Sequence, residues 1–333
     1  GVNTIDVEAA SARGIFVTNC PGKNAAAVAE LAVGLILSLD RRIPDNVTDL
    51  RNGLWNKKDY SKSEGIKGKT VGVIGTGQIG QEVMARLRPF GVRLVGWSRS
   101  LTPEMAERLE IERCADRLEL ARQSDIVTVH VALTSDTRGF LNQAFFDAMK
   151  PGALFINTSR AEVVDSQAML TALNAGKIRV GTDVFDQEPS AGQADFDNPV
   201  AKHPAVVGTC HIGASTQQAE FETGEEAARI ARAYVTGHPI PNCVNMRETP
   251  ANSYGLMVRH EDRVGVLAGV FQALKEEGLN VQEMENLIFA GARAACAHIL
   301  LDNPVPDRVL QRLTGCDGVI FARATEPGVP AGV

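Results

Sequence analysis

The sequence is poor in aromatic residues and has no excess of positive charge. Phe, Trp and Tyr make up 5% of its 333 residues, and 34 Lys and Arg stand against 40 Asp and Glu, a net charge of −6. Proteins that coat nucleic acid or anionic membranes depend on clustered basic side chains, often with stacking aromatic rings. The composition therefore argues against nucleic acid and against a membrane surface as partners.

Paired cysteines and long apolar runs are also missing. The six Cys are scattered and form no CxxC pair, which argues against a disulfide framework and against a zinc site. The longest apolar run, residues 25–39, contains Glu30 and is shorter than the roughly 20 residues of a membrane span. We therefore expect a cytoplasmic protein with reduced thiols, without a metal site and without a membrane segment.

From residue 66 the sequence alternates between two hydrophobic periods. Short β-branched runs are typical of buried strands, and helical stretches such as residues 165–176 lie between most of them. This alternation predicts parallel βαβ units in a doubly wound α/β sheet. The expected strands are 69–75, 92–97, 125–133, 152–159, 179–185 and 205–210.

A glycine-rich turn follows the first expected strand. Gly75, Gly77 and Gly80 in VGVIGTGQIG form GxGxxG between a strand and a helix, the context of a dinucleotide fingerprint. Glycines permit the tight turn and let a pyrophosphate approach the helix N-terminus. Residues 24–213 are therefore expected to form a Rossmann domain that binds a nicotinamide cofactor.

The choice between NAD and NADP stays open. The acid that binds the ribose of NAD is expected about 20 residues after the fingerprint, where this chain has Ser98, with Arg99 and Arg93 nearby. In one interpretation no carboxylate repels a 2′-phosphate, and Arg99 pairs with it. In the other, Arg99 is a solvated loop residue and NAD binds through other contacts.

Three reactive side chains follow the ends of later strands, where ligands bind in an open α/β sheet. Arg160 lies in NTSRAEVVD, Glu188 in GTDVFDQEP and His211 in GTCHIGAST. A guanidinium suits a substrate carboxylate, an imidazole can take and return a hydroxyl proton, and a carboxylate bonded to that imidazole would hold its tautomer. We predict these three as catalytic residues, and we expect the neighbouring Cys210 to pack in the interior.

Together these motifs resemble the D-isomer-specific 2-hydroxyacid dehydrogenases over nearly the whole chain. The resemblance implies an NAD(P)-dependent oxidoreductase that acts on the CH–OH group of a small D-2-hydroxy acid. It also implies a homodimer or homotetramer paired through residues 24–40 and 53–57. The cofactor-binding residues, fingerprint glycines included, would be Gly75, Gly77, Gln78, Ile79, Gly80, Ser98, Arg99, Thr158, Ser159, Arg160, Asp183 (on the nicotinamide amide), His211, Ile212, Gly213 and Ala214.

After a linker signal at residues 237–242, residues 254–325 show a βαββαβ pattern that predicts a ferredoxin-like α+β domain. This part resembles the ACT amino-acid-sensing domain. Within the family, an ACT domain indicates the D-3-phosphoglycerate dehydrogenases, which interconvert 3-phospho-D-glycerate and 3-phosphooxypyruvate in the first step of L-serine biosynthesis. An L-serine effector would then bind at His260, Asp262 and Asn280; a purely structural or dimerising domain is the alternative.

The sequence starts at Gly1 with a helix and a strand that have nothing before them to pack on. We therefore expect residues 1–23, with residues 214–246 returning to them, to be the remnant of a truncated flavodoxin-like substrate domain, without a complete substrate pocket. The alternative functions are a glyoxylate or hydroxypyruvate reductase, which Ser98–Arg99 would suit with NADPH, and a nicotinamide-sensing binding protein.

Overall fold

The computed structural model describes residues 2, 4–247 and 253–325. The chain divides into two compact units, Gly1–Val244 and Asn245–Val333, and each has a hydrophobic core of its own. Among the described residues, no helix is long and apolar enough to cross a membrane.

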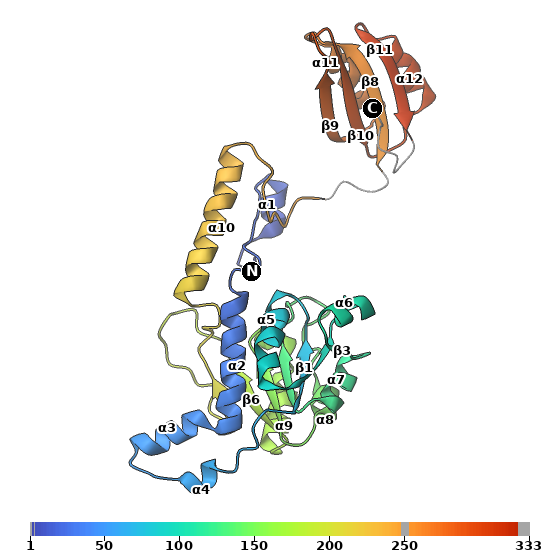
Figure 1. Cartoon of the computed structure of the whole chain (residues 1–333). Helices are drawn as coiled ribbons and strands as arrows, with labels where there is room; N and C mark the ends of the chain where they lie inside the picture. The colour runs from blue at the N-terminus through green and yellow to red at the C-terminus, as the bar shows by residue number, and fades with distance from the viewer. Residues whose placement is uncertain (1, 3, 248–252, 326–333) are drawn as a thin grey trace. The chain divides into compact units, whose positions relative to one another are not determined.

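The first unit is built on a seven-stranded sheet in the order β3-β2-β1-β4-β5-β6-β7 (Figure 1). All neighbouring strands are parallel, and Val71 of β1 lies level with Leu94 of β2 and with Ile126 of β4. The predicted doubly wound fold is confirmed, and the strand order reverses between β1 and β4. The strands are β1 (Thr70–Ile74), β2 (Arg93–Trp97), β3 (Glu112–Arg113), β4 (Ile126–Val129), β5 (Ala153–Asn157), β6 (Ile178–Thr182) and β7 (Val206–Gly208).

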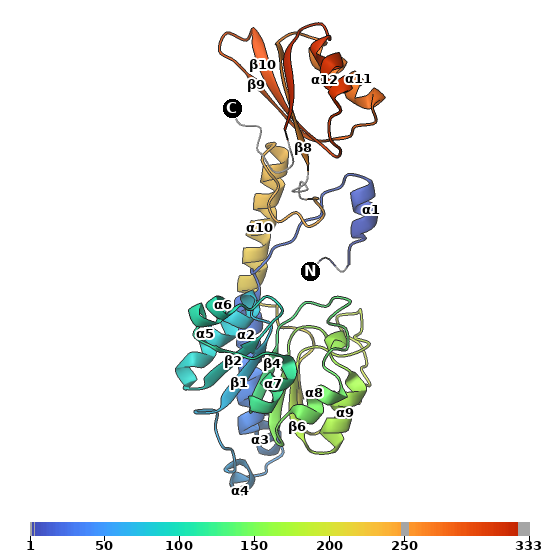
Figure 2. The same cartoon turned by 90° about the vertical axis from the view of Figure 1, so that its right-hand side faces the viewer.

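Helices cover both faces of this sheet (Figure 2). Leu154 and Ile156 of β5 face α2 and α5, whereas Phe155 faces α7, α8 and α9. Because both faces are buried, the strands are continuous apolar runs, and each fully buried Leu, Ile or Phe contributes about 1.5–3 kcal/mol. The described helices of this unit are α1 (Val7–Ala12), α2 (Ala25–Arg41), α3 (Ile43–Arg51), α4 (Lys57–Tyr60), α5 (Gln78–Leu87), η1 (Arg88–Phe90), α6 (Pro103–Arg108), α7 (Arg117–Gln123), α8 (Gln143–Ala148), η2 (Ala161–Val163), α9 (Ser166–Asn174) and α10 (Gln217–Val235).

Local side-chain chemistry sets the ends of α9 as the sequence predicts. The Asp165 carboxylate accepts hydrogen bonds from the backbone N–H groups of Gln167 and Ala168, which would otherwise lack partners in the first turn. Gly176 follows the helix with φ +66°, a conformation that glycine adopts without a Cβ penalty. Asp165 therefore marks the start of α9, and Gly176 follows its end, as the sequence predicts.

Residues 14–20 lie against α10 and the segment that follows it. Val17 accepts a hydrogen bond from the backbone N–H of Val244, and the ring of Phe16 contacts that of Tyr234 edge-on at 6.2 Å. The structure thus places both segments that we assign to a substrate domain side by side. Residues 1 and 3 of the expected remnant lie outside the described residues, and its assignment stays a prediction.

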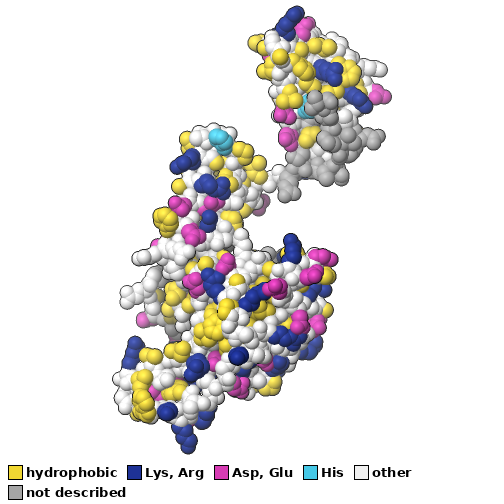
Figure 3. Space-filling model, in the orientation of Figure 1, with side chains coloured by type: hydrophobic (Ala, Val, Ile, Leu, Met, Phe, Trp, Pro, Cys, Tyr) yellow, Lys and Arg dark blue, Asp and Glu magenta, His cyan; other side chains and the backbone are white. Residues whose placement is uncertain are grey.

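An arm formed by α3, α4 and the connection between them carries exposed apolar side chains (Figure 3). Trp55 is 81% exposed, and several aliphatic side chains of the arm are also exposed. Contiguous exposed apolar side chains of this kind are typical of a surface that is covered in an assembly. The apolar residues of the arm are Ile43, Val47, Leu50, Leu54 and Trp55.

The second unit has the predicted element order βαββαβ. Its antiparallel sheet has the order β11-β8-β10-β9, and Leu256, Ile299, Val270 and Val309 belong to its core. This order agrees with the predicted ferredoxin-like topology. The elements are β8 (Tyr254–Glu261), α11 (Val266–Glu276), β9 (Val281–Ile288), β10 (Ala294–Leu301), α12 (Asp307–Thr314) and β11 (Val319–Thr325).

Candidate active site

Of the three fingerprint glycines in the loop after β1, one leaves room for a ligand and two are required by contacts within the protein. At Gly75, with φ +94°, an added Cβ would lie 2.3 Å from the carbonyl oxygen of His130, and at Gly80 it would lie 2.1 Å from that of Gly75. Contacts within the protein therefore require these two glycines. Gly77, the N-cap of α5, has nothing within 4 Å of an added Cβ, which leaves open space at the helix N-terminus for a phosphate.

Two buried polar atoms at this edge of the sheet have no hydrogen-bond partner among the described residues. They are Oγ1 of Thr158, in the loop after β5, and Nδ1 of His130, after β4. Burial lowers the pKa of His130 to about 3, so its imidazole is neutral, and its Nε2 lies 2.8 Å from Thr128 Oγ1. An unpartnered buried hydroxyl costs about 1–3 kcal/mol. A ligand that bonds to Thr158 would remove that cost, so this edge fits a dinucleotide.

The end of β2 has no carboxylate but is connected to its neighbours by side-chain contacts. Ser98 Oγ lies 2.9 Å from Thr76 Oγ1 of the glycine-rich loop. Arg99 pairs with Asp136 of the loop after β4, at 2.7 Å. Arg93 begins β2 and pairs with Glu112 of β3. Arg93 therefore lies at the opposite end of the strand, and the prediction that it is near Ser98 is wrong.

Glu188 and His211 contact each other directly. Glu188 Oε2 lies 2.6 Å from His211 Nδ1, and Glu188 Oε1 accepts a hydrogen bond from the backbone N–H of Phe185 at 2.8 Å. His211 and Gln187 adopt φ values of +53° and +60°, which are uncommon for residues other than glycine and persist only where surrounding contacts hold them. Since Glu188 occupies Nδ1, Nε2 is the nitrogen left for a substrate.

Arg160 lines the same hollow as Glu188 and His211, a space of about 260 Å³. Asn157, the last residue of β5, donates from Nδ2 to the carbonyl of Arg160 at 2.9 Å and accepts from the N–H and the hydroxyl of Ser159. The structure thus brings together the three residues predicted to be catalytic. Asn157 is a positioning residue that sequence reasoning missed, although a polar residue at the end of a buried strand is a usable signal.

Asp183 holds the loop that carries His211. Its carboxylate, 1% exposed, accepts hydrogen bonds from Thr209 Oγ1 and from the backbone N–H groups of Ile212 and Gly213 at 2.6–2.9 Å. The contacts assign Asp183 a positioning role, and its contact with a nicotinamide amide stays a prediction. The other predicted cofactor residues, Gln78, Ile79, Ser159, Ile212, Gly213 and Ala214, lie in the first turn of α5 and in the loops after β5 and β7.

The prediction that Cys210 packs in the interior is wrong. Strand β7 ends at Gly208, so Cys210 lies in a loop and its side chain is exposed. The alternation of side chains along a strand therefore does not apply to it. Among the described residues, no group of three or more His, Cys, Asp or Glu side chains could hold a metal ion.

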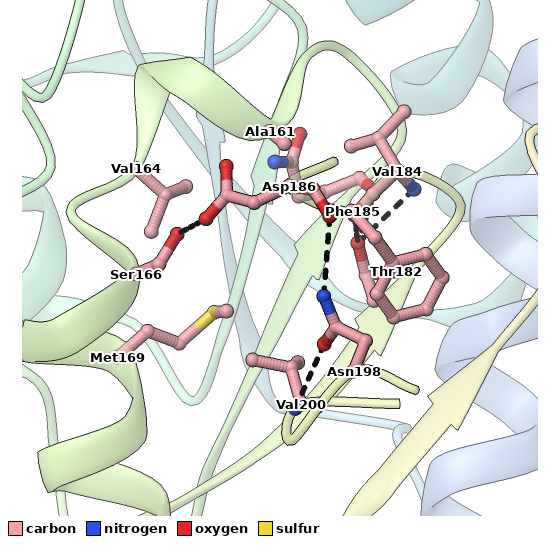
Figure 4. A pocket seen from close by; sticks show the side chains of 11 residues that line it. Ala161, Val164, Ser166, Met169, Thr182, Val184, Phe185, Asp186, Asn198 and Val200 are labelled. Atoms are coloured by element: carbon pink, nitrogen blue, oxygen red, sulfur yellow. Dashed lines mark hydrogen bonds between the residues drawn. The ribbon is translucent and has the colours of Figure 1, made fainter. Parts of the chain in front are cut away.

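A small cavity of about 20 Å³ is lined by Val184, Phe185 and Asp186, which lead into the turn before Glu188, and by residues of the loop after β5 and of α9 (Figure 4). Ser166 at the start of α9 donates to the carboxylate of Asp186, and Asn198 Nδ2 donates to the carbonyl of Asp186 at 3.2 Å. Asn198 Oδ1 accepts in turn from the N–H of Val200 at 2.9 Å. These bonds anchor the turn at Asp186, two residues before Glu188. No motif in the sequence singles out Ser166 or Asn198 for this role.

In the second unit the three predicted effector residues do not form one site within a single chain. His260 on β8 is 2% exposed, and its Nε2 lies 3.1 Å from Asn286 Oδ1. Asn280 precedes β9 at the end of the sheet where β8 begins with Tyr254. Six positions along a strand span about 20 Å, so Asn280 lies far from His260 and from Asp262, which follows β8 directly.

Comparisons with known proteins agree on one family. Residues 33–213 match the sequence model of the D-isomer specific 2-hydroxyacid dehydrogenase family, NAD binding domain. The chain is 36% identical over 295 residues to the D-3-phosphoglycerate dehydrogenase of Methanocaldococcus jannaschii, covering 88% of this chain and 55% of that protein. It is 37% identical over 252 residues to the glyoxylate reductase of Thermococcus litoralis, covering 74% of each.

A solved structure shares the fold of the first unit. The D-lactate dehydrogenase of Aquifex aeolicus, complexed with NAD and lactic acid, is 27% identical, with a TM-score of 0.67, over 74% of this chain and 78% of that one. The chain spans about half the length of the D-3-phosphoglycerate dehydrogenases that it matches. Since the family's NAD-binding domain matches more than half of the chain, and the predicted fold and cofactor edge are present, the chain belongs to the D-isomer-specific 2-hydroxyacid dehydrogenase family.

Proposed function

We propose that this protein interconverts a D-2-hydroxy acid and the corresponding 2-oxo acid with a nicotinamide cofactor. The contact of 2.6 Å between Glu188 and His211, in the hollow that Arg160 also lines, carries the proposal. A nicotinamide cofactor held at the carboxyl end of the sheet would supply the hydride chemistry at C2 of the substrate. The chain itself binds the substrate and moves the proton.

Each of the three side chains has a distinct task. Arg160 binds the substrate carboxylate through its guanidinium and polarises the adjacent oxygen. His211 Nε2 takes the proton of the hydroxyl group in oxidation and gives it back in reduction. Glu188 holds Nδ1 of His211, which keeps the imidazole in the tautomer that leaves Nε2 free and stabilises the imidazolium that forms.

For the substrate we propose 3-phospho-D-glycerate and 3-phosphooxypyruvate, the first step of L-serine biosynthesis. Support comes from the 36% identity to a D-3-phosphoglycerate dehydrogenase over 88% of the chain. A glyoxylate or hydroxypyruvate reductase is the second candidate, favoured by the 37% identity to a glyoxylate reductase. A nicotinamide-sensing binding protein is a third, because a dehydrogenase site can persist in a partner-binding protein.

The test follows the absorbance of reduced nicotinamide with 3-phosphooxypyruvate, hydroxypyruvate and glyoxylate, each with NADH and NADPH. Preference for the phosphorylated acid supports the first substrate, and preference for either of the other two supports the reductase. The variant His211→Asn separates enzyme from sensor. Lost turnover with retained cofactor binding supports the enzyme, whereas turnover that His211→Asn leaves unchanged contradicts it.

We also propose that the protein is a homo-oligomer with a second unit that binds an effector, L-serine. The exposed apolar arm, which includes residues 53–57 of the predicted pairing surface, supports a homodimer, because covering apolar side chains is favourable. The other predicted pairing segment, residues 24–40, corresponds to α2, most of whose apolar side chains pack in the core of the first unit. Asn280 and His260 lie far apart within a single chain. An effector site that uses both residues would therefore need two copies of the chain. L-serine should then lower the turnover rate of the wild-type protein, and His260→Ala should abolish that inhibition without changing the uninhibited rate.

A further inference from the structure

An ion pair crosses the edge of the sheet where the cofactor's adenosine half would bind. Arg99 follows β2, Asp136 lies in the loop after β4, and their side chains meet at 2.7 Å between Nη1 and Oδ2. Strand β1, with the glycine-rich loop at its end, lies between β2 and β4 in the sheet. The pair therefore bridges the carboxyl end of β1, with the two side chains 65% and 68% exposed.

Arg99 of this pair lies next to the position at which Rossmann domains bind the ribose of a dinucleotide. In Rossmann domains the residue at the end of the second strand contacts the ribose hydroxyls, and an acid there favours NAD. This chain has Ser98 at that position, bonded to Thr76 of the glycine-rich loop at 2.9 Å. The carboxylate is missing from β2, but Asp136 supplies one next to Arg99 from the other side of β1.

We propose that Asp136 determines the cofactor preference of this protein, in favour of NAD(H) over NADP(H), by occupying Arg99. This inference rests on the proposed nicotinamide-dependent function. A 2′-phosphate would have to displace the Asp136 carboxylate from the Arg99 guanidinium and would be repelled by it. The ribose hydroxyls of NAD(H) carry no charge, so they leave the ion pair intact.

A second cation near this position is held by other contacts. Arg113 of β3 donates from Nε to the carbonyl of Leu101 at 2.8 Å, and Leu101 in turn donates its N–H to the carbonyl of Ser98. Arg113 therefore supports the turn that presents Arg99, and its charge is unchanged in variants of Arg99 or Asp136. Breaking the Arg99–Asp136 pair therefore changes whether the Arg99 guanidinium is available to a phosphate, and it leaves the contact of Arg113 unchanged.

The experiment is a titration of the whole chain with NADH and with NADPH, followed by the fluorescence of the reduced nicotinamide. We expect the wild-type protein to bind NADH more tightly than NADPH. Asp136→Asn should tighten NADPH binding about fivefold, because an exposed ion pair is worth up to about 1 kcal/mol and 1.4 kcal/mol is tenfold. NADH binding should change by less than twofold, and added salt should shrink the gain.

Two further variants make the test specific. Arg99→Gln in the Asp136→Asn background should remove the gain in NADPH affinity, because no guanidinium is left to bind the phosphate. Asp317→Asn, which breaks an Arg–Asp pair of the same 2.7 Å length with Arg263 in the second unit, is the matched control and should change neither affinity.

Three results would overturn the inference. They are equal changes in both affinities in Asp136→Asn, a gain that survives Arg99→Gln, and a wild-type protein that prefers NADPH. If the wild-type protein binds neither cofactor, the proposed function fails together with this inference. The first three results leave the proposed function standing.

Discussion

Replacing Glu188 by Gln tests the catalytic arrangement most directly, because it removes a charge and keeps the size of the side chain. An uncharged amide can still bond to His211, but a hydrogen bond to a charged group is worth about 1.5–3 kcal/mol and a neutral one about 1 kcal/mol. The side chains of His211 and Glu188 are 45% and 31% exposed, so solvent screening favours the lower end of the difference. The lower end of that difference, about 0.5 kcal/mol, corresponds to a roughly twofold lower rate.

The loss should fall on kcat rather than on KM. Glu188 contacts His211 and the backbone of Phe185, and its effect on the substrate arises when His211 carries the proton in the transition state. The assay measures steady-state rates of 2-oxo acid reduction for the wild-type protein and for Glu188→Gln. Glu162→Gln is the matched control, since Glu162 lines the same hollow and the substitution changes the charge equally.

Proton NMR of the wild-type protein and Glu188→Gln gives a second readout of this contact. A short hydrogen bond from His211 Nδ1 to a carboxylate predicts a strongly downfield N–H resonance, which the amide variant should lose. Equal loss of kcat in Glu188→Gln and Glu162→Gln would show that the general charge of the hollow matters and that the His211 contact does not. Unchanged kcat in Glu188→Gln would refute the assigned role.

Three further predictions concern the supports of the site. Asn198→Ala removes a hydrogen bond that anchors the turn at Asp186, so kcat should fall about three- to tenfold. The affinity for NADH, measured by fluorescence titration, should stay within about twofold of the wild-type value. An equal loss in kcat and in NADH affinity would contradict a local positioning role. Gly77→Val should fold normally, because an added Cβ meets no protein atom, yet weaken NADH binding at least tenfold; unchanged binding would place the pyrophosphate elsewhere. The low pKa of His130, about 3, means that the unfolded chain binds the proton first as the pH falls below about 6.5. The free energy of unfolding should therefore fall by about 2 kcal/mol between pH 6.5 and pH 5 because of His130. Urea unfolding of His130→Asn should lack this part of the pH dependence. Identical pH dependences of the wild-type protein and the variant would refute the low pKa of His130.

Much of the first unit could be predicted from the sequence because its signals are local. The parallel strands are continuous apolar runs with polar residues at their ends, and the GxGxxG turn needs only neighbouring residues to be recognised. Arg160, Glu188 and His211 could be selected in the same way, since each lies within six residues of the end of a strand. Strand β3 was not predicted, because a strand of two residues is too short to show a periodic pattern of apolar residues.

Tertiary structure alone decided which partner each side chain meets. Arg93 and Arg99 lie six residues apart in the sequence, yet the strand direction sends Arg93 to Glu112 and Arg99 to Asp136. The end of β7 at Gly208 decides that Cys210 is exposed.

The same holds for residues that act on the site from a distance. Strand order places β10 between β8 and β9, which contributes to separating His260 from Asn280. The bond of Asn198 to Asp186 joins residues 12 positions apart. Residue type and local spacing thus determined the elements and the chemistry available at their ends. Pairing across the sheet is set by packing of the whole core, which no local pattern encodes, so the partners of those groups emerged only from the folded chain.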